Sequence, residues 1–236
     1  APHLNHATGT VNVGGAYLLT GTIAPNITVD VEPAAPEVTA LLMGEDIAQG
    51  SAGITVALAD VLLPTDGVPE LIVGAHLANS TSANDAGRVY VVDGNRIVPG
   101  VEIDLADADL IFEGVEGGAE TGYALAVGDV ICGGAPEIIV GAPRQSGVGS
   151  DSGAVYVLSE LDLSVDSGLA QIDESPFLML MIEGEENTDR LGTDVSVGPS
   201  TSLAGGGCED LLLGAPRWDE AGGSAGAAYL FRSNEA

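Results

Sequence analysis

Lysine is absent from the chain, and six arginines are opposed by 35 aspartates and glutamates, which gives a formal net charge of −29 over 236 residues. The phosphates of nucleic acids repel so acidic a chain, so binding of nucleic acid through a basic patch is excluded. The same repulsion disfavours an anionic membrane surface. We therefore expect no nucleic-acid partner.

Long apolar runs and aromatic residues are scarce as well. The longest apolar run, residues 177–182, has six residues, whereas a membrane-spanning helix needs about 20, so we expect no membrane insertion. Aromatic residues make up 4% of the chain, but hydrophobic residues make up 45%, which is too much for intrinsic disorder. The sequence predicts a folded protein with a hydrated anionic surface.

The acidity has two explanations that the sequence leaves open. One is adaptation to high salt, which screens the self-repulsion of the surface. The other is a GC-rich genome, which favours Asp and Arg over Lys. The chain also starts without the basic and apolar segments of a secretory signal, so any signal peptide has already been removed. Two Asn-x-Thr sequons, at Asn26 and Asn79, are weak evidence for glycosylation.

Glycine is abundant, with 34 residues, and it marks an internal repeat of about 70 residues. An apolar run ends in glycine at Gly44, Gly114 and Gly184. A segment in which apolar and polar or small residues alternate begins after Gly53, Gly122 and Gly192. A fully apolar triplet follows, and the Gly-Ala pair after it ends at Ala75, Ala142 and Ala215. A Gly-x-x-Tyr segment ends at Tyr90, Tyr156 and Tyr229, with a fourth copy ending at Tyr17.

Each repeat contains four short apolar segments bounded by turn residues, and no stretch sustains helical periodicity. We predict an all-β fold of β-propeller-type blades, each of four antiparallel strands, in about three and a quarter repeats. The predicted units are an N-terminal segment (residues 1–13), a partial blade with only third and fourth strands (14–48), two blades (49–118 and 119–188) and a three-stranded C-terminal blade (189–236).

The order and period of these motifs resemble the FG-GAP repeat of integrin alpha chains and of many secreted bacterial and archaeal proteins. The resemblance extends from about Gly14 to Phe231. Gly-Ala-Pro is intact twice, and His76 replaces its proline in the other copy, whereas the Phe of Phe-Gly is absent throughout. The resemblance implies a β-propeller, an extracellular or cell-surface location and a role in adhesion.

In that family the loop between the first two strands often binds calcium through alternating carboxylates. The matching positions in this chain are Asp60, Asp66 and Glu70 in one repeat and Asp129 and Glu137 in the next. We take the first three as candidate calcium ligands and the last two as weaker ones, because Ile131 and Gly133 occupy ligand positions there. The favoured alternative is that these acids cap turns and face water.

Cys132 and Cys208 both fall in this loop, in consecutive repeats. Under the resemblance, the loops lie on one face of neighbouring blades, so we predict a disulfide that closes about 75 residues and contributes roughly 4 kcal/mol. The alternative is two unpaired small hydrophobic side chains. A disulfide also fits an extracellular location.

The sequence contains no zinc motif and no convincing nucleophile motif. Trp218, the only tryptophan, is the candidate ligand contact, and its alternative role is to cover a blade edge. About 13 predicted strands do not close a ring of six or seven blades. One explanation is that the chain is part of a longer propeller protein, and the other is that its open blade edges bind a protein partner or another copy of the chain.

We therefore expect a non-catalytic extracellular adhesion or surface-structural protein that acts through its loops and blade edges and self-assembles. The alternatives are a secreted carboxylate-dependent hydrolase and a glycan-binding lectin on a propeller scaffold. Fold analogy alone does not decide among these functions.

Overall fold

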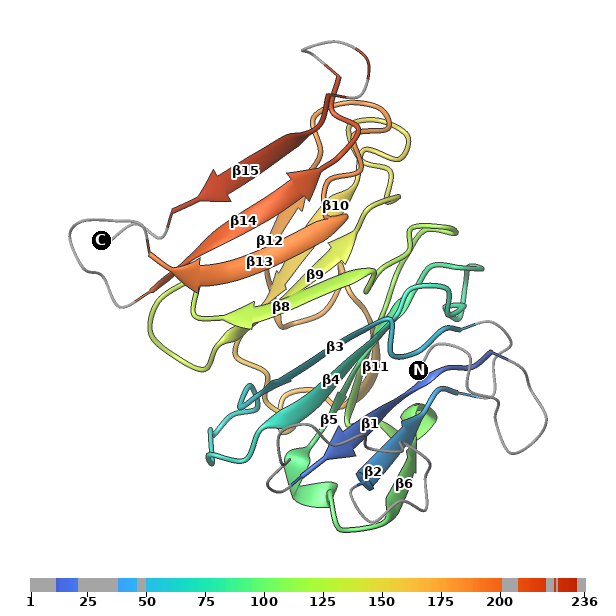
Figure 1. The fold of residues 1–236 in the computed structure, drawn as a ribbon, viewed down its shortest axis with the longest axis vertical. Helices are drawn as coiled ribbons and strands as arrows, with labels where there is room; N and C mark the ends of the chain where they lie inside the picture. Colours follow the sequence, from blue (N-terminus) through green and yellow to red (C-terminus); the bar gives the residue numbers. More distant parts are fainter. Residues whose placement is uncertain are drawn as a thin grey trace, which may run out of the picture.

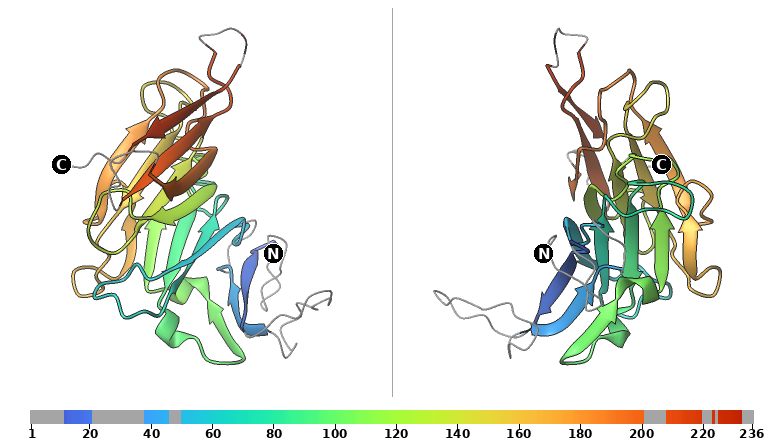
Figure 2. Two further views of the ribbon diagram at one scale, coloured as in Figure 1. Left: turned by 60° about the vertical axis from the view of Figure 1, so that its left-hand side comes forward. Right: turned by 90° about the vertical axis from the view of Figure 1, so that its right-hand side faces the viewer.

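The computed structural model describes residues 12–20, 38–45, 50–200, 208–219, 223 and 225–232. These residues form 15 strands and two short 3-10 helices, and the strands make four sheets that stack side by side (Figure 1). The prediction of an all-β fold with propeller-type blades is confirmed. The stack does not close into a ring, and its first and fourth sheets lie at opposite ends (Figure 2).

The second and third sheets are complete antiparallel blades. The second blade consists of β3 (Thr55–Ala59), β4 (Glu70–Ala75), β5 (Arg88–Val92) and β7 (Leu110–Glu113). The third blade consists of β8 (Ala124–Gly128), β9 (Glu137–Ala142), β10 (Ala154–Leu158) and β12 (Leu178–Glu183).

The end sheets are shorter. The first blade has β1 (Gly15–Leu19) and β2 (Val38–Met43), and the fourth blade has β13 (Asp194–Pro199), β14 (Glu209–Ala215) and β15 (Ala227–Phe231). The described residues therefore contain the strands that the repeat predicts.

Two further strands were not predicted. β6 (Val101–Asp104) and β11 (Gly168–Gln171) lie between the third and fourth strands of the second and third blades. Each leaves its own blade and pairs in parallel with the outermost strand of the preceding blade, β6 with β2 and β11 with β7. The prediction of 13 strands is therefore wrong by two. Because neighbouring blades share strands in this way, the predicted unit boundaries stay a prediction.

The 3-10 helices η1 (Gly94–Arg96) and η2 (Leu105–Asp107) flank β6. None of the described segments forms a helix long and apolar enough to cross a membrane.

The core consists of three apolar clusters, each between two neighbouring blades. In β4, Leu71 and Val73 pack toward the first blade, whereas Ile72 packs toward the third. A middle strand that is covered on both faces carries consecutive apolar residues, which explains the apolar triplets of the repeat.

The glycines after these triplets allow the inner strands of neighbouring blades to approach closely. A Cβ on Gly141 would lie 2.1 Å from the carbonyl oxygen of Gly192, and a Cβ on Gly74 would lie 2.4 Å from that of Gly122. Thr55 in β3 also donates its hydroxyl hydrogen to the Gly122 oxygen at 3.0 Å. Only glycine fits these two positions without a shift of the backbone.

Candidate functional site

In the second and third blades, a buried glutamate begins the second strand and contacts the loop that precedes it. In the second blade, Glu70 is 2% exposed, and its Oε2 accepts the backbone N–H groups of Val61 and Leu62 at 2.7 and 3.0 Å. Burial raises the pKa of Glu70, and these two hydrogen bonds oppose the rise. The side chain therefore caps the turn that follows β3.

Glu137 repeats this arrangement one blade later. Its Oε2 accepts the N–H groups of Val130 and Ile131 at 2.8 and 3.2 Å, and its Oε1 accepts the hydroxyl of Ser159 at 3.0 Å. The recurrence at the first position of β4 and β9 shows that an acid here stabilises the loop of each blade.

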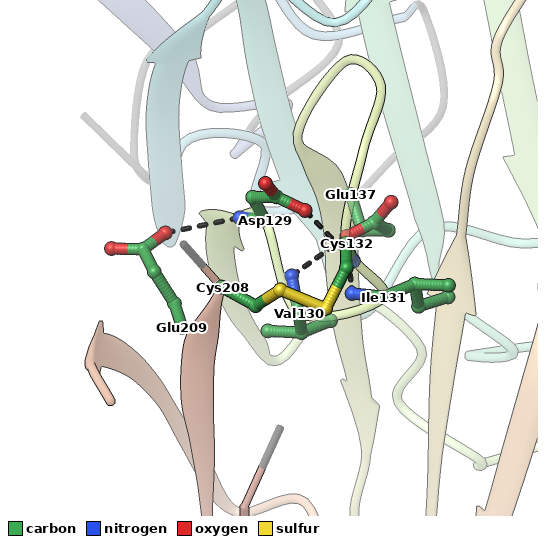
Figure 3. The surroundings of a disulfide bond; sticks show 7 residues. All are labelled: Asp129, Val130, Ile131, Cys132, Glu137, Cys208 and Glu209. Carbon is green, nitrogen blue, oxygen red and sulfur yellow. Dashed lines mark hydrogen bonds between the residues drawn. A yellow bond between two sulfur atoms is a disulfide. The ribbon is translucent and has the colours of Figure 1, made fainter. Parts of the chain in front are cut away.

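Cys132 and Cys208 form the predicted disulfide, with their Cα atoms 5.1 Å apart and a sequence separation of 76 (Figure 3). Polar contacts surround it: Asp129 accepts the N–H of Cys132 at 2.9 Å, and Glu209 accepts the N–H of Asp129 at 3.0 Å. The Glu209 N–H in turn donates to the Asp129 carbonyl at 2.7 Å. The third and fourth blades are thus joined by one covalent bond and two hydrogen bonds at this end.

The candidate calcium ligands of residues 60–70 all bind their own loop. Asp60 accepts the N–H of Gly67 at 2.7 Å, and Asp66 accepts that of Val68 at 2.8 Å. Among the residues that the structure describes, no group of three or more His, Cys, Asp or Glu converges as metal ligands would. Calcium prefers six to eight oxygens, so the residues do not fit a calcium cage as they stand, and calcium binding stays a prediction.

A polar groove of about 480 Å³ lies where this loop meets the third blade. The second blade contributes residues 62–64, Asp66, Glu70, Asp93 and Asn95, and the third blade contributes residues 162–164. Four carboxylates line the groove: Asp66, Glu70, Asp93 and Asp162. Leu63 and Pro64 add apolar surface.

All four carboxylates accept hydrogen bonds, and those to Asp66 and Asp162 lower the pKa of each side chain. The Asn95 side chain donates to Asp66 at 2.7 Å and lowers the pKa of Asp66, with help from the Val68 N–H. Ser164 lowers the pKa of Asp162 through its hydroxyl and its backbone N–H, which donates at 2.8 Å. At neutral pH both aspartates therefore present anionic oxygens to the groove.

A second groove, of about 230 Å³, lies between the first and second blades and has an almost wholly aliphatic lining that includes Leu18, Val56 and Leu58. Ligand sites combine apolar surface with a few convergent polar groups. We therefore take the polar groove as the candidate functional site.

The remaining predicted residue, Trp218, packs against the cluster between the third and fourth blades. Its backbone N–H donates to Ala215 at 3.4 Å, and its carbonyl accepts from Gly226 at 2.9 Å. This placement favours the role of covering a blade edge, and a ligand contact stays a prediction. Of the two sequons, Asn79 accepts the N–H of Asp85 at 2.9 Å, and Asn26 lies outside the described residues.

Of the residues that line the groove, the sequence pointed to Asp66 and Glu70, as candidate calcium ligands, and did not point to Asp93, Asn95 and Asp162. The missed residues follow the third strand of each blade, where the chain turns outward to form β6 and β11. An acid soon after the Gly-x-x-Tyr strand in two successive repeats was the signal that could have revealed them.

The chain is similar in sequence to several known proteins that share one name. No protein-family model matches the chain. The chain is 31% identical over 183 residues to phosphatidylinositol-glycan-specific phospholipase D of Bos taurus, covering 75% of this chain and 20% of the relative. The protein of the same name from Homo sapiens is 39% identical over 107 residues, covering 43% of this chain and 12% of the relative.

The chain spans about a fifth of the length of the first of these relatives and less of the second. The same-named protein of Mus musculus is 31% identical over 156 residues, covering 65% of this chain and 17% of the relative.

All of these relatives are named as enzymes, so the prediction of a non-catalytic adhesion or surface-structural protein is wrong. The hydrolase alternative is the one that the chain's relatives support.

Proposed function

We propose that the chain is a substrate-binding part of a secreted hydrolase that acts on phosphatidylinositol-glycans. The similarity to phosphatidylinositol-glycan-specific phospholipase D over 183 residues is the observation that carries this proposal. The polar groove between the second and third blades supplies a site of suitable size and chemistry.

The chemistry of the groove favours the glycan over the phosphodiester. Sugar hydroxyl groups donate hydrogen bonds to carboxylates and accept them from the amide of Asn95 and the hydroxyl of Ser164. Leu63 and Pro64 offer apolar surface to the C–H face of a sugar ring. The negative charge of the carboxylates that line the groove would repel a phosphate. The groove therefore binds the neutral sugar, and cleavage of the phosphodiester is not assigned to it.

We further infer that the repeats are of the FG-GAP type and that the protein is extracellular. The two intact Gly-Ala-Pro segments and the close approach at Gly141 support the repeat type. The disulfide supports an oxidising compartment. Mass spectrometry of the secreted protein checks the location by finding the intact disulfide.

Calcium binding by residues 60–70 remains a separate prediction. A cation there would compete with Asn95 for Asp66 and with the Gly67 N–H for Asp60. A calcium titration followed through the amide resonance of Gly67 checks it, because bound calcium would shift that resonance and chelator would restore it.

The proposed function is tested by titrating the chain with a lipid-free inositol glycan in a calorimeter. We expect binding that Asp66→Asn and Asp162→Asn each weaken by roughly 5–30-fold, the cost of about 1–2 kcal/mol for a lost charged hydrogen bond. The matched control is Glu102→Gln, because Glu102 is exposed on β6 outside the groove. Equal affinity in all four proteins would contradict the assignment of the groove.

In the enzyme that carries this chain, the same substitutions should raise the KM for a phosphatidylinositol-glycan and leave kcat unchanged. A loss of kcat would instead place the two aspartates among the reacting groups.

A further inference from the structure

Among the strands that the structure describes, the outer strand β12 of the third blade (Leu178–Glu183) has an open edge, whereas the outer strands β2 and β7 are each covered by a further strand. In the described part of the chain, β12 pairs with β10 alone. Met179 and Leu180 of β12 are 54% and 46% exposed, but every residue of β7 is buried. β12 lies along the outer margin of the stack in both views of Figure 2.

The two covering strands use the same register. Val101 of β6 lies opposite Ala40, and Gly168 of β11 lies opposite Leu110. Ala40 and Leu110 each stand four residues before the glycine that ends the outer-strand motif. Leu180 holds that position in β12. The repeat therefore predicts where a covering strand on β12 would begin.

The covering strands also place apolar side chains at the same two positions, the third and the fifth. In the segment that covers β2, these residues are Ile103 and Leu105, which are 5% and 0% exposed. In the segment that covers β7, they are Ala170, which lies opposite Phe112, and Ile172, which is 0% exposed. Each covering segment thus closes the core between two blades as well as the edge of a sheet.

A cavity of about 80 Å³ is present where such side chains would enter on the third blade. Leu180 and Ile182 of β12 form one wall, and Phe231 of β15 lies across from them. Leu180 and Ile182 correspond in the repeat to Leu110 and Phe112, which are both buried. The cavity is large enough for a few methyl groups, which is what Ile103 and Leu105 supply to the first blade.

Backbone groups of β12 point toward the open edge. Gly184 donates its N–H to Gly153 at 2.9 Å, next to β10, and donors alternate along a strand, so the N–H groups of Met181 and Glu183 face outward. On β7 the corresponding edge is used, because Ile172 donates to the carbonyl of Glu113 at 2.9 Å.

We propose that the β12 edge binds an extended polypeptide strand, added in parallel with its first residue opposite Leu180 and apolar side chains at its third and fifth positions. A basic residue at the fourth position would lie opposite Glu183, which is exposed, and would complement the charge of −29. A second copy of this chain is not the partner that fits, because its strands of this pattern, β6 and β11, are already paired within the described residues.

The probe is the capped hexapeptide Val-Thr-Ile-Arg-Leu-Thr, used free and also fused after Arg232 through a flexible linker of about ten residues. Arg232 lines the same cavity as Leu180, so the linker can span the distance and raise the effective concentration to about millimolar. The control peptide is N-methylated at positions three and five, whose N–H groups would bond β12. A second control is N-methylated at positions two and four, whose N–H groups would point away.

The measurement is hydrogen exchange at single amides. We expect the unmodified peptide and the second control to slow exchange at Met181 and Glu183 by about tenfold or more, and the first control to leave it unchanged. Ile111 and Glu113 of β7 should be protected in every sample. Unchanged exchange at Met181 and Glu183 in the fused protein would overturn the proposal. Protection that appears without peptide and grows with protein concentration would also overturn it, because a second copy would then cover the edge.

Discussion

Asp66 is the residue whose electrostatics most directly reflects the geometry of the groove. Its side chain is held by the Asn95 amide and the Val68 N–H, and both hydrogen bonds favour the carboxylate. These contacts lower the pKa of Asp66 below its ordinary value of 3.8. A lowered pKa stabilises the folded state above the unfolded value, and this contribution is lost as the pH falls through the folded value.

The first prediction is that Asn95→Ala raises the pKa of Asp66 toward 3.8, because the larger of its two hydrogen bonds is removed. The carboxyl carbon resonance of Asp66, followed by NMR from neutral to acidic pH, gives the midpoint. Ser164→Ala is the matched control, since it should move the midpoint of Asp162 and leave that of Asp66 in place. Identical Asp66 midpoints in wild type and Asn95→Ala would show that the amide does not hold the carboxylate.

At the scale of elements, the neighbouring blade decides whether the second strand of a blade requires glycine near its end. Gly141, the next-to-last residue of β9, lies against Gly192 of the fourth blade, so that a Cβ on Gly141 would be 2.1 Å from the Gly192 carbonyl oxygen. The repeat-equivalent Gly214 is the next-to-last residue of β14, where an added Cβ would lie 3.6 Å from the Asp194 side chain, an ordinary van der Waals distance. The same glycine is therefore required sterically between two blades and not in the fourth blade.

The second prediction compares alanine at these two positions. Gly141→Ala should lower the free energy of unfolding by about 2–3 kcal/mol, because the inner strands of two blades must move apart. Gly214→Ala should change it by less than about 0.5 kcal/mol. Denaturant titrations of both variants measure the difference. A Gly214→Ala variant as unstable as Gly141→Ala would mean that the strand itself, rather than the neighbouring blade, requires glycine.

The third prediction concerns the disulfide, which joins the third and fourth blades. Replacing Cys132 and Cys208 together by alanine should cost about 2–5 kcal/mol, since the bond closes a loop of 76 residues. Hydrogen exchange should accelerate most in β13 to β15. Reduction of the wild-type protein should reproduce the pattern of the double variant. Loss of protection spread evenly over all blades would instead mean that the chain unfolds as one cooperative unit.

The second and third strands of each blade could be predicted because the same motif recurs in each repeat. The motif is an apolar triplet before Gly-Ala for the second strand and Gly-x-x-Tyr for the third. β6 and β11 could not be predicted, since Val101–Asp104 and Gly168–Gln171 have only a few apolar positions in common and pair with a strand of another blade. The groove itself was not predicted, although two of its residues were named as candidate calcium ligands. Asp66 and Glu70 belong to a loop of the repeat, but Asp162 reaches the groove only through the packing of two blades.

For the whole molecule, the arrangement of charge matters more than its total. The net charge of −29 belongs to the entire chain, but four of its carboxylates line one groove at the junction of two blades. Such a site attracts hydroxyl donors and repels phosphate. If the chain contributes to a hydrolase of phosphatidylinositol-glycans, the groove recognises the sugar and leaves the phosphodiester to other groups.

The most direct test of this account is amide chemical-shift mapping of the chain with a lipid-free inositol glycan, with and without its phosphate group. We predict shifts confined to the groove, at residues 62–67, Asn95 and residues 162–164, with weaker binding when the phosphate is present. Shifts elsewhere on the blades, or tighter binding of the phosphorylated glycan, would contradict the account.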